Sequence, residues 1–231
     1  MPKKRLLLQA GHVAPREIGF ESGTGTSGEQ TLVHPIEHEL IQLLDRDGRF
    51  NVTHSHGDVP DGWKGDLFLA LHGDGSADPE ASGFSFGYPP GCSECKRLAD
   101  TFAAWYEQIP GAPKRRSDNY TDALSGYYGW RRTDAPAKLL VEHGFLSNPG
   151  ERTWLFGNVA AIAQAHFEAI LHYFGLELQP PANFWAWARW YRGHGEYRSY
   201  GGPRKGPRPN VPRRIPLAWW GRLRRNLGRP A

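Results

Sequence analysis

Three short apolar runs, each of strand length and each leading into polar residues, constrain the fold of this chain most strongly. They span residues 6–9, 66–71 and 138–142. Between them lie segments whose apolar residues recur at three- and four-residue spacing, which is typical of amphipathic helices. Strands that alternate with helices predict an α/β domain of three layers, α/β/α, with a largely parallel twisted sheet.

The helical pattern is clearest in three segments. It predicts helices over residues 29–44, 93–108 and 151–174, the last closed by Gly175 as its C-cap. Residues 50–53 are predicted as a further strand. With about 180 residues, this part of the chain is long enough to bury one hydrophobic core.

A diproline at Pro180-Pro181 predicts the boundary between two parts of the chain, because it cannot continue a helix. We therefore expect a catalytic domain over residues 1–178, a proline-rich joint over 179–183 and an Arg/Trp-rich C-terminal segment over 184–231. The formal net charge is +4, but 12 of the 28 basic side chains and one of the 24 acidic ones lie after Pro181. The segment after Pro181 thus carries +11 and the part before it −7, which predicts a basic, aromatic appendage that binds an anionic surface.

Several classes of protein are disfavoured. No stretch approaches the roughly 18–20 uncharged apolar residues that span a bilayer. The basic N-terminus has an apolar run of only three leucines, so we interpret it as the first strand rather than a signal peptide. Two cysteines, Cys92 and Cys95, are too few for a disulfide framework, and we expect synthesis in the cytosol.

Four polar residues lie where strands end or where a loop meets a helix: His12, Glu29, His72 and Glu142. Side chains at the carboxyl ends of parallel strands converge at one edge of the sheet. Two imidazoles and a carboxylate are the ligands of many hydrolytic zinc sites, and a further carboxylate can act as general base and acid. The same positions also suit histidines that are merely hydrogen-bonded in loops, and spacing alone does not decide between the two.

The motifs around these residues resemble the zinc-dependent N-acetylmuramoyl-L-alanine amidases of the amidase-3 type. They are Leu-Leu-Leu-Gln-Ala-Gly-His12, Gly-Thr-Ser-Gly-Glu29, the strand ending in His72-Gly-Asp-Gly-Ser and the block Val-Glu142-His-Gly-Phe-Leu-Ser-Asn-Pro, in the family's order over roughly residues 5–175. The resemblance implies that His12, Glu29 and His72 bind Zn²⁺ and that Glu142 is the catalytic carboxylate. The Gln-Ala-Gly-His start, where the family usually has an Asp-Pro-Gly-His-like one, departs from its pattern.

The resemblance also implies a reaction: hydrolysis of the amide between N-acetylmuramic acid and L-alanine of the peptidoglycan stem peptide through a zinc-activated water. Because the substrate lies outside the cytoplasm, we expect a phage endolysin that is made in the host cytoplasm without a signal peptide and acts at the bacterial cell wall after release. The alternatives are a bacterial autolysin or sporulation amidase, a zinc carboxypeptidase and a non-catalytic wall-binding protein.

Other residues carry weaker signals. His34 and His38 have metal-like spacing but equally suit a solvated helix face, His54 and His56 suit a loop rim, and His143 suits a supporting role behind the site. Cys92 and Cys95 are either a local disulfide or free thiols. Four aromatic residues and two arginines either line a groove or pack beneath its rim: Tyr120, Tyr127, Tyr128, Trp130, Arg131 and Arg132.

The C-terminal segment interleaves arginine with tryptophan, a pattern found in nucleic-acid binders and in interfacial segments. Given the resemblance, we expect it to bind anionic envelope polymers or outer-membrane lipid beside the peptidoglycan substrate, and we expect no nucleic-acid partner. The alternative is that its aromatic residues simply cover the catalytic domain.

Overall fold

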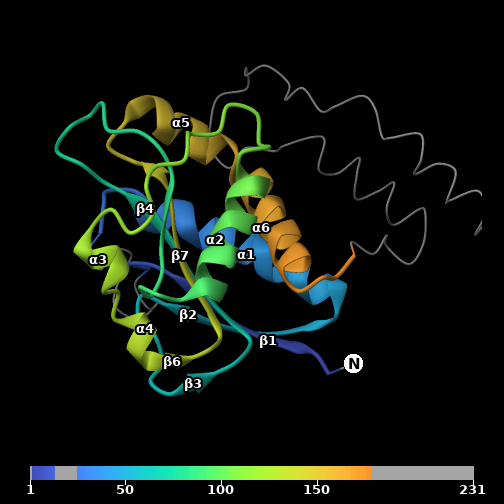
Figure 1. Ribbon diagram of the computed structural model, residues 1–231. Helices are drawn as coiled ribbons and strands as arrows, with labels where there is room; N and C mark the ends of the chain where they lie inside the picture. Colours follow the sequence, from blue (N-terminus) through green and yellow to red (C-terminus); the bar gives the residue numbers. More distant parts are fainter. Residues whose placement is uncertain (1, 14–24, 178–231) are drawn as a thin grey trace, which may run out of the picture. The chain divides into compact units, whose positions relative to one another are not determined.

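The computed structural model describes residues 2–13 and 25–177 (Figure 1). The chain divides into two units, residues 1–179 and 180–231, and all described residues belong to the first. The predicted joint and the Arg/Trp-rich segment lie outside the described residues. In the described part, no helix combines the length and the apolar character that crossing a membrane requires.

A five-stranded sheet forms the centre of the first unit, in the order β2-β1-β4-β7-β5. All neighbouring strands are parallel except β5, which runs antiparallel to β7. The strands are β1 (Lys4–Ala10), β2 (Phe50–His56), β4 (Leu67–Asp74), β5 (Ser85–Gly87) and β7 (Ala137–Phe145). Two short strands, β3 (Trp63–Lys64) and β6 (Thr133–Asp134), pair separately.

Helices cover both faces of the sheet, which confirms the predicted α/β class (Figure 1). The larger core packs the strands against α1 (Glu29–Asp47), α2 (Ser93–Tyr106) and α6 (Val159–Tyr173). The opposite face carries a smaller core with two short helices, α3 (Asp122–Ser125) and α4 (Gly129–Arg132).

The alternation along the strands decides which face each side chain meets. In β4, Leu69 and Leu71 lie in the larger core, whereas Phe68 and Ala70 lie in the smaller one. Successive side chains of a strand point to opposite faces, so the side chain of His72 lies on the same face as those of Phe68 and Ala70. The His72 side chain therefore lies on the face with the short helices.

The single helix predicted over residues 151–174 is wrong, because the chain forms two helices there. Helix α5 (Pro149–Gly157) begins early, since the Asn148 side chain accepts the N–H groups of residues 150 and 151 and proline suits the first helical turn. It ends at Gly157, and Asn158 leaves helical geometry with φ −124° before α6 starts. Gly and Asn are both poor helix formers, which explains the break.

Two further predictions are settled by the described residues. Strand β2 continues past residue 53 to His56, so His54 and His56 belong to a strand and not to a loop rim. Cys92 and Cys95 form a disulfide at the start of α2, which decides between the two states that the sequence leaves open.

Candidate active site

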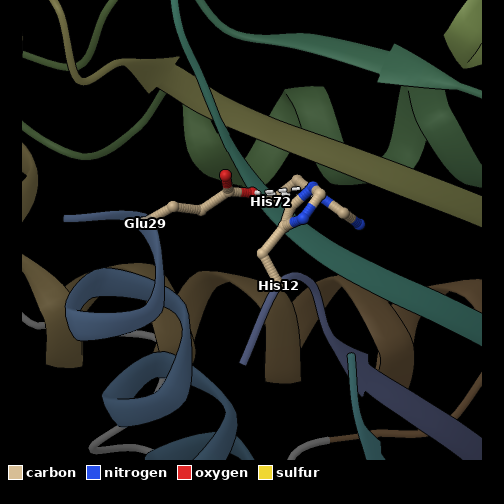
Figure 2. Close-up of side chains that lie close together, drawn as sticks. All are labelled: His12, Glu29 and His72. Atoms are coloured by element: carbon tan, nitrogen blue, oxygen red, sulfur yellow. Dashed lines mark hydrogen bonds and ion pairs between the residues drawn. The ribbon is translucent and has the colours of Figure 1, made fainter. Parts of the chain in front are cut away.

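His12, Glu29 and His72 converge at the carboxyl end of the sheet, as Figure 2 shows. His12 follows β1, Glu29 is the first residue of α1 and His72 lies in β4. One ligand atom from each lies within 4.8 Å of the others. Glu29 Oε1 is 3.0 Å from His72 Nδ1 and 4.0 Å from His12 Nε2, and the two imidazole centroids are 5.1 Å apart.

The Glu29 carboxylate is held by backbone groups on two sides. The N–H of Thr26 donates to Oε2 at 2.9 Å, and the N–H of Gly73 donates to Oε1 at 3.2 Å. Burial alone would raise the pKa of Glu29, but the hydrogen bond and charge of His72 and the charge of His12 hold it below its ordinary value. The positive end of the helix dipole also favours a carboxylate in the first turn of α1. Glu29 is thus buried and kept ionised, as a metal ligand must be.

The backbone around His12 is specialised for a close approach to His72. His12 has φ +55°, in the left-handed region that non-glycine residues seldom occupy and that occurs preferentially at functional sites. A Cβ added to Gly11 would lie 2.2 Å from the His72 ring, so any other residue at this position would displace that ring. Burial lowers the pKa of His12, although the Glu29 carboxylate opposes this effect, and the neutral imidazole that a metal ligand requires is favoured.

A pair of buried histidines supports β4 from behind. The His143 Nδ1–H donates to the carbonyl oxygen of His72 at 2.6 Å, which leaves His143 Nε2 to accept from His166 Nε2–H at 2.8 Å. Both rings are therefore neutral, in agreement with burial that lowers the pKa of His143 to about 4 and holds the pKa of His166 well below its ordinary value. His143 thus contacts the backbone of His72 and takes the supporting place that its alternation along the strand suggested.

Glu142 lies beside the three converging residues on the neighbouring strand β7. Its Cα is in register with that of His72, and paired residues of parallel strands direct their side chains to the same face. Glu142 Oε2 is buried and, within residues 2–13 and 25–177, has no hydrogen-bond partner. Burial, followed by the charges of Asp74 and Glu29, raises the pKa of Glu142 well above its ordinary value. A half-buried carboxyl group with a raised pKa is suited to exchange protons with a substrate.

Sequence reasoning did not single out Asp74, which lies near Glu142 together with Tyr120. Asp74 accepts a hydrogen bond from the Tyr120 hydroxyl, and its own pKa is raised mainly by burial. The carboxylates of Asp74 and Glu142 also raise the pKa of Tyr120, after the larger effect of burial. The available signal was the place of Asp74 in the His72-Gly-Asp-Gly-Ser motif, because the pairing with β7 shifts register between His72 and Asp74 and interrupts the regular alternation.

The aromatic residues near the site mostly pack beneath it. The Tyr127 hydroxyl donates to Gln9 Oε1 at 2.8 Å and its ring contacts that of His72 edge-on at 5.8 Å, while the Tyr128 hydroxyl donates to a backbone carbonyl. Trp130 is buried and donates to the carbonyl of Leu124. These bonds favour the packing interpretation over a binding groove.

The donor atoms of His12, Glu29 and His72 are of the kinds that bind zinc. Two imidazoles and one carboxylate form a typical three-ligand catalytic set. The buried His72 Nε2 atom has no hydrogen-bond partner among the residues that the structure describes, so it requires a ligand or solvent. His38, by contrast, contacts Gln42 on its own helix and is not among the three converging ligands.

A known protein family matches most of the chain. The profile of the Amidase_3 family, described as N-acetylmuramoyl-L-alanine amidase, matches residues 6–172. No protein of curated function matches the chain in sequence.

Several solved amidase structures resemble the first unit in fold. The catalytic domain of CwlV from Bacillus (Paenibacillus) polymyxa var. colistinus is 21% identical, with 75% of this chain and 99% of that one covered at a TM-score of 0.59. CwlD from Clostridioides difficile, solved in complex with the GerS lipoprotein, is 19% identical, with 76% and 100% covered at 0.60. AmiC2 of Nostoc punctiforme is 19% identical, with 74% and 97% covered at 0.57.

Proposed function

We propose that this chain, which belongs to the N-acetylmuramoyl-L-alanine amidase family Amidase_3, cleaves peptidoglycan between N-acetylmuramic acid and L-alanine with the aid of Zn²⁺. His12, Glu29 and His72 would hold the ion, and Glu142 would transfer the protons. The observation that carries this proposal is the convergence of two imidazoles and one ionised carboxylate, beside a second carboxyl group of raised pKa.

A zinc ion with three protein ligands lowers the pKa of a coordinated water to about 7 and polarises a carbonyl group. The protein's own contribution is the placement of Glu142 on the same sheet face as His72. As a carboxylate, Glu142 accepts one proton from the attacking water while the new C–O bond forms. As a carboxylic acid, it then donates that proton to the amide nitrogen as the C–N bond breaks.

Both protons of the water are accounted for by this sequence. One reaches the nitrogen through Glu142 and the other is lost from the new carboxylic acid at neutral pH. The products are the lactyl carboxylate of the sugar and a free α-amino group on L-alanine. No covalent enzyme intermediate is needed, and the side chain of Glu142 ends in its initial state.

Removal of the metal tests the cofactor in this proposal. Treatment with a chelator and desalting is expected to abolish the solubilisation of purified peptidoglycan, and stoichiometric Zn²⁺ is expected to restore it. The reason is that His12, Glu29 and His72 position the water only through a bound ion. Turbidity loss of a peptidoglycan suspension measures the effect, and full activity of demonstrably zinc-free protein would contradict the proposal.

We further propose that the Arg/Trp-rich segment attracts the enzyme to anionic envelope polymers or outer-membrane lipid. The support is the charge contrast in the sequence, +11 after Pro181 against −7 before it. Synthesis in a host cytoplasm and action in phage-induced lysis remain predictions from the sequence.

Truncation after Gln179 tests the attraction. The full chain is expected to sediment with purified cell walls at low salt and to lose this binding as salt rises, because the Debye length falls from about 10 Å at 0.1 M to about 3 Å at 1 M. The truncated chain is expected to bind weakly at every salt concentration. Equal sedimentation of the two chains would reject an attracting role for the segment.

A further inference from the structure

A second group of metal-ligating side chains lies between α1 and β2. It consists of His34 and Glu37 on the helix and His56 at the end of the strand, and one ligand atom from each lies within 4.8 Å of the others. Glu37 Oε2 is 3.0 Å from His56 Nε2, and the rings of His34 and His56 are 5.2 Å apart. Glu37 follows Glu29 by eight residues, which is about 12 Å along a helix axis. The group shares no residue with the candidate active site.

The Glu37 carboxylate is the unusual member of this group. Its side chain is 2% exposed, and its Oε1 atom is buried without a hydrogen-bond partner anywhere in residues 2–13 and 25–177. No ion pair of Glu37 with a lysine or arginine occurs among the described residues, and burial raises its pKa to about 8. Burying a carboxyl group without full hydrogen bonding costs free energy, so this carboxylate requires a compensating partner.

The geometry suits an ion as that partner. Residues three apart on a helix are neighbours on its surface, which brings His34 beside Glu37. Zinc bonds to imidazole and carboxylate of about 2.0–2.2 Å place tetrahedral donors about 3.3–3.6 Å apart. The distance of 3.0 Å between Glu37 Oε2 and His56 Nε2 is close to this value, and all three ligand atoms lie within 4.8 Å of one another. His34 and His56 are both partly exposed, so an ion has access from solvent.

We propose that His34, Glu37 and His56 form a second binding site for a divalent transition metal of the zinc class. Two imidazoles and one carboxylate favour zinc, copper or nickel over magnesium and calcium, which prefer all-oxygen sites. An ion in this site binds α1 to β2 and supplies the partner that Glu37 Oε1 lacks. Its role is separate from that of the active site, because the Glu29 end of α1 lies about two turns away.

Zinc stoichiometry of the full chain tests this proposal. After equilibration with Zn²⁺ and desalting, elemental analysis is expected to find two equivalents in the unaltered protein and one in Glu37→Gln. Glu37→Gln retains the size of the side chain and replaces a carboxylate oxygen that can bind a metal with an amide group, and His56→Ala, at a partly exposed position, gives a second variant with the same expectation. His38→Ala is the matched control on the same helix, and it is expected to retain two equivalents.

A His72→Ala variant separates this site from the first one. It is expected to retain one equivalent, and His72→Ala/Glu37→Gln is expected to retain none. Circular dichroism in the presence of a chelator shows that each variant is folded before its zinc is counted. A second equivalent that survives both Glu37→Gln and His56→Ala, or a single equivalent in the unaltered chain that Glu37→Gln leaves intact, would overturn the proposal.

Discussion

Glu142→Gln is expected to reduce the rate of peptidoglycan hydrolysis by about 10²–10⁴-fold, the usual contribution of a general acid–base residue. Glutamine keeps the size of the side chain but can neither accept the proton of the attacking water nor donate it to the leaving nitrogen. Zinc content is expected to remain unchanged, since Glu142 is not among the three converging ligands. Initial rates on purified peptidoglycan and elemental analysis of the same sample measure both effects.

Glu80→Gln provides a control of the same chemistry at an exposed position. It is expected to retain the rate of the unaltered protein. A Glu142→Gln protein that keeps more than about one tenth of this rate, and is folded and loaded with zinc, would remove Glu142 from the mechanism.

His72→Ala is expected to lose the zinc equivalent of the active site and with it all measurable lysis. Replacement of residues that only support a ligand already costs 10–100-fold in metal affinity, so loss of a direct ligand is expected to cost more than about 100-fold. The measurement is a zinc titration of metal-free protein, followed by turbidity loss of a peptidoglycan suspension with excess Zn²⁺ present.

The comparison with Glu142→Gln makes this result specific. Glu142→Gln separates activity from metal binding, whereas His72→Ala removes both together. His38→Ala, which replaces an exposed histidine, is expected to affect neither property. An active His72→Ala protein would contradict the assignment of the ligand set.

The buried strands and the main helices could be predicted from the sequence because each carries a strong local pattern. The first five residues of β4, 67–71, are all apolar since both faces of the strand are covered, and α1 has a regular apolar stripe. The strands β3, β5 and β6 have only two or three residues, too few to show any period. The break between α5 and α6 depends on a cap and two poor helix formers within a stripe that continues across it.

The residues of the candidate site were predictable for a related reason. Topology alone brings the ends of β1, β4 and β7 to one edge, and the polar residues that follow the apolar runs stand out in the sequence. Asp74 and Tyr120 were not predictable as a pair, because 46 residues separate them and only the folded chain joins them. The same holds for His34 and His56: the sequence pairs His34 with His38 by spacing, whereas the fold places it against a strand.

Identification of the bond that the enzyme cleaves in peptidoglycan tests the central claim most directly. Purified peptidoglycan digested with the full-length protein is expected to gain free α-amino groups of L-alanine, in proportion to the turbidity lost, and to gain no reducing sugar ends. Amino-terminal labelling and a reducing-sugar assay on the same digest distinguish the two. New reducing ends, or new amino termini on a residue other than L-alanine, would show that the enzyme does not cleave the amide bond between N-acetylmuramic acid and L-alanine.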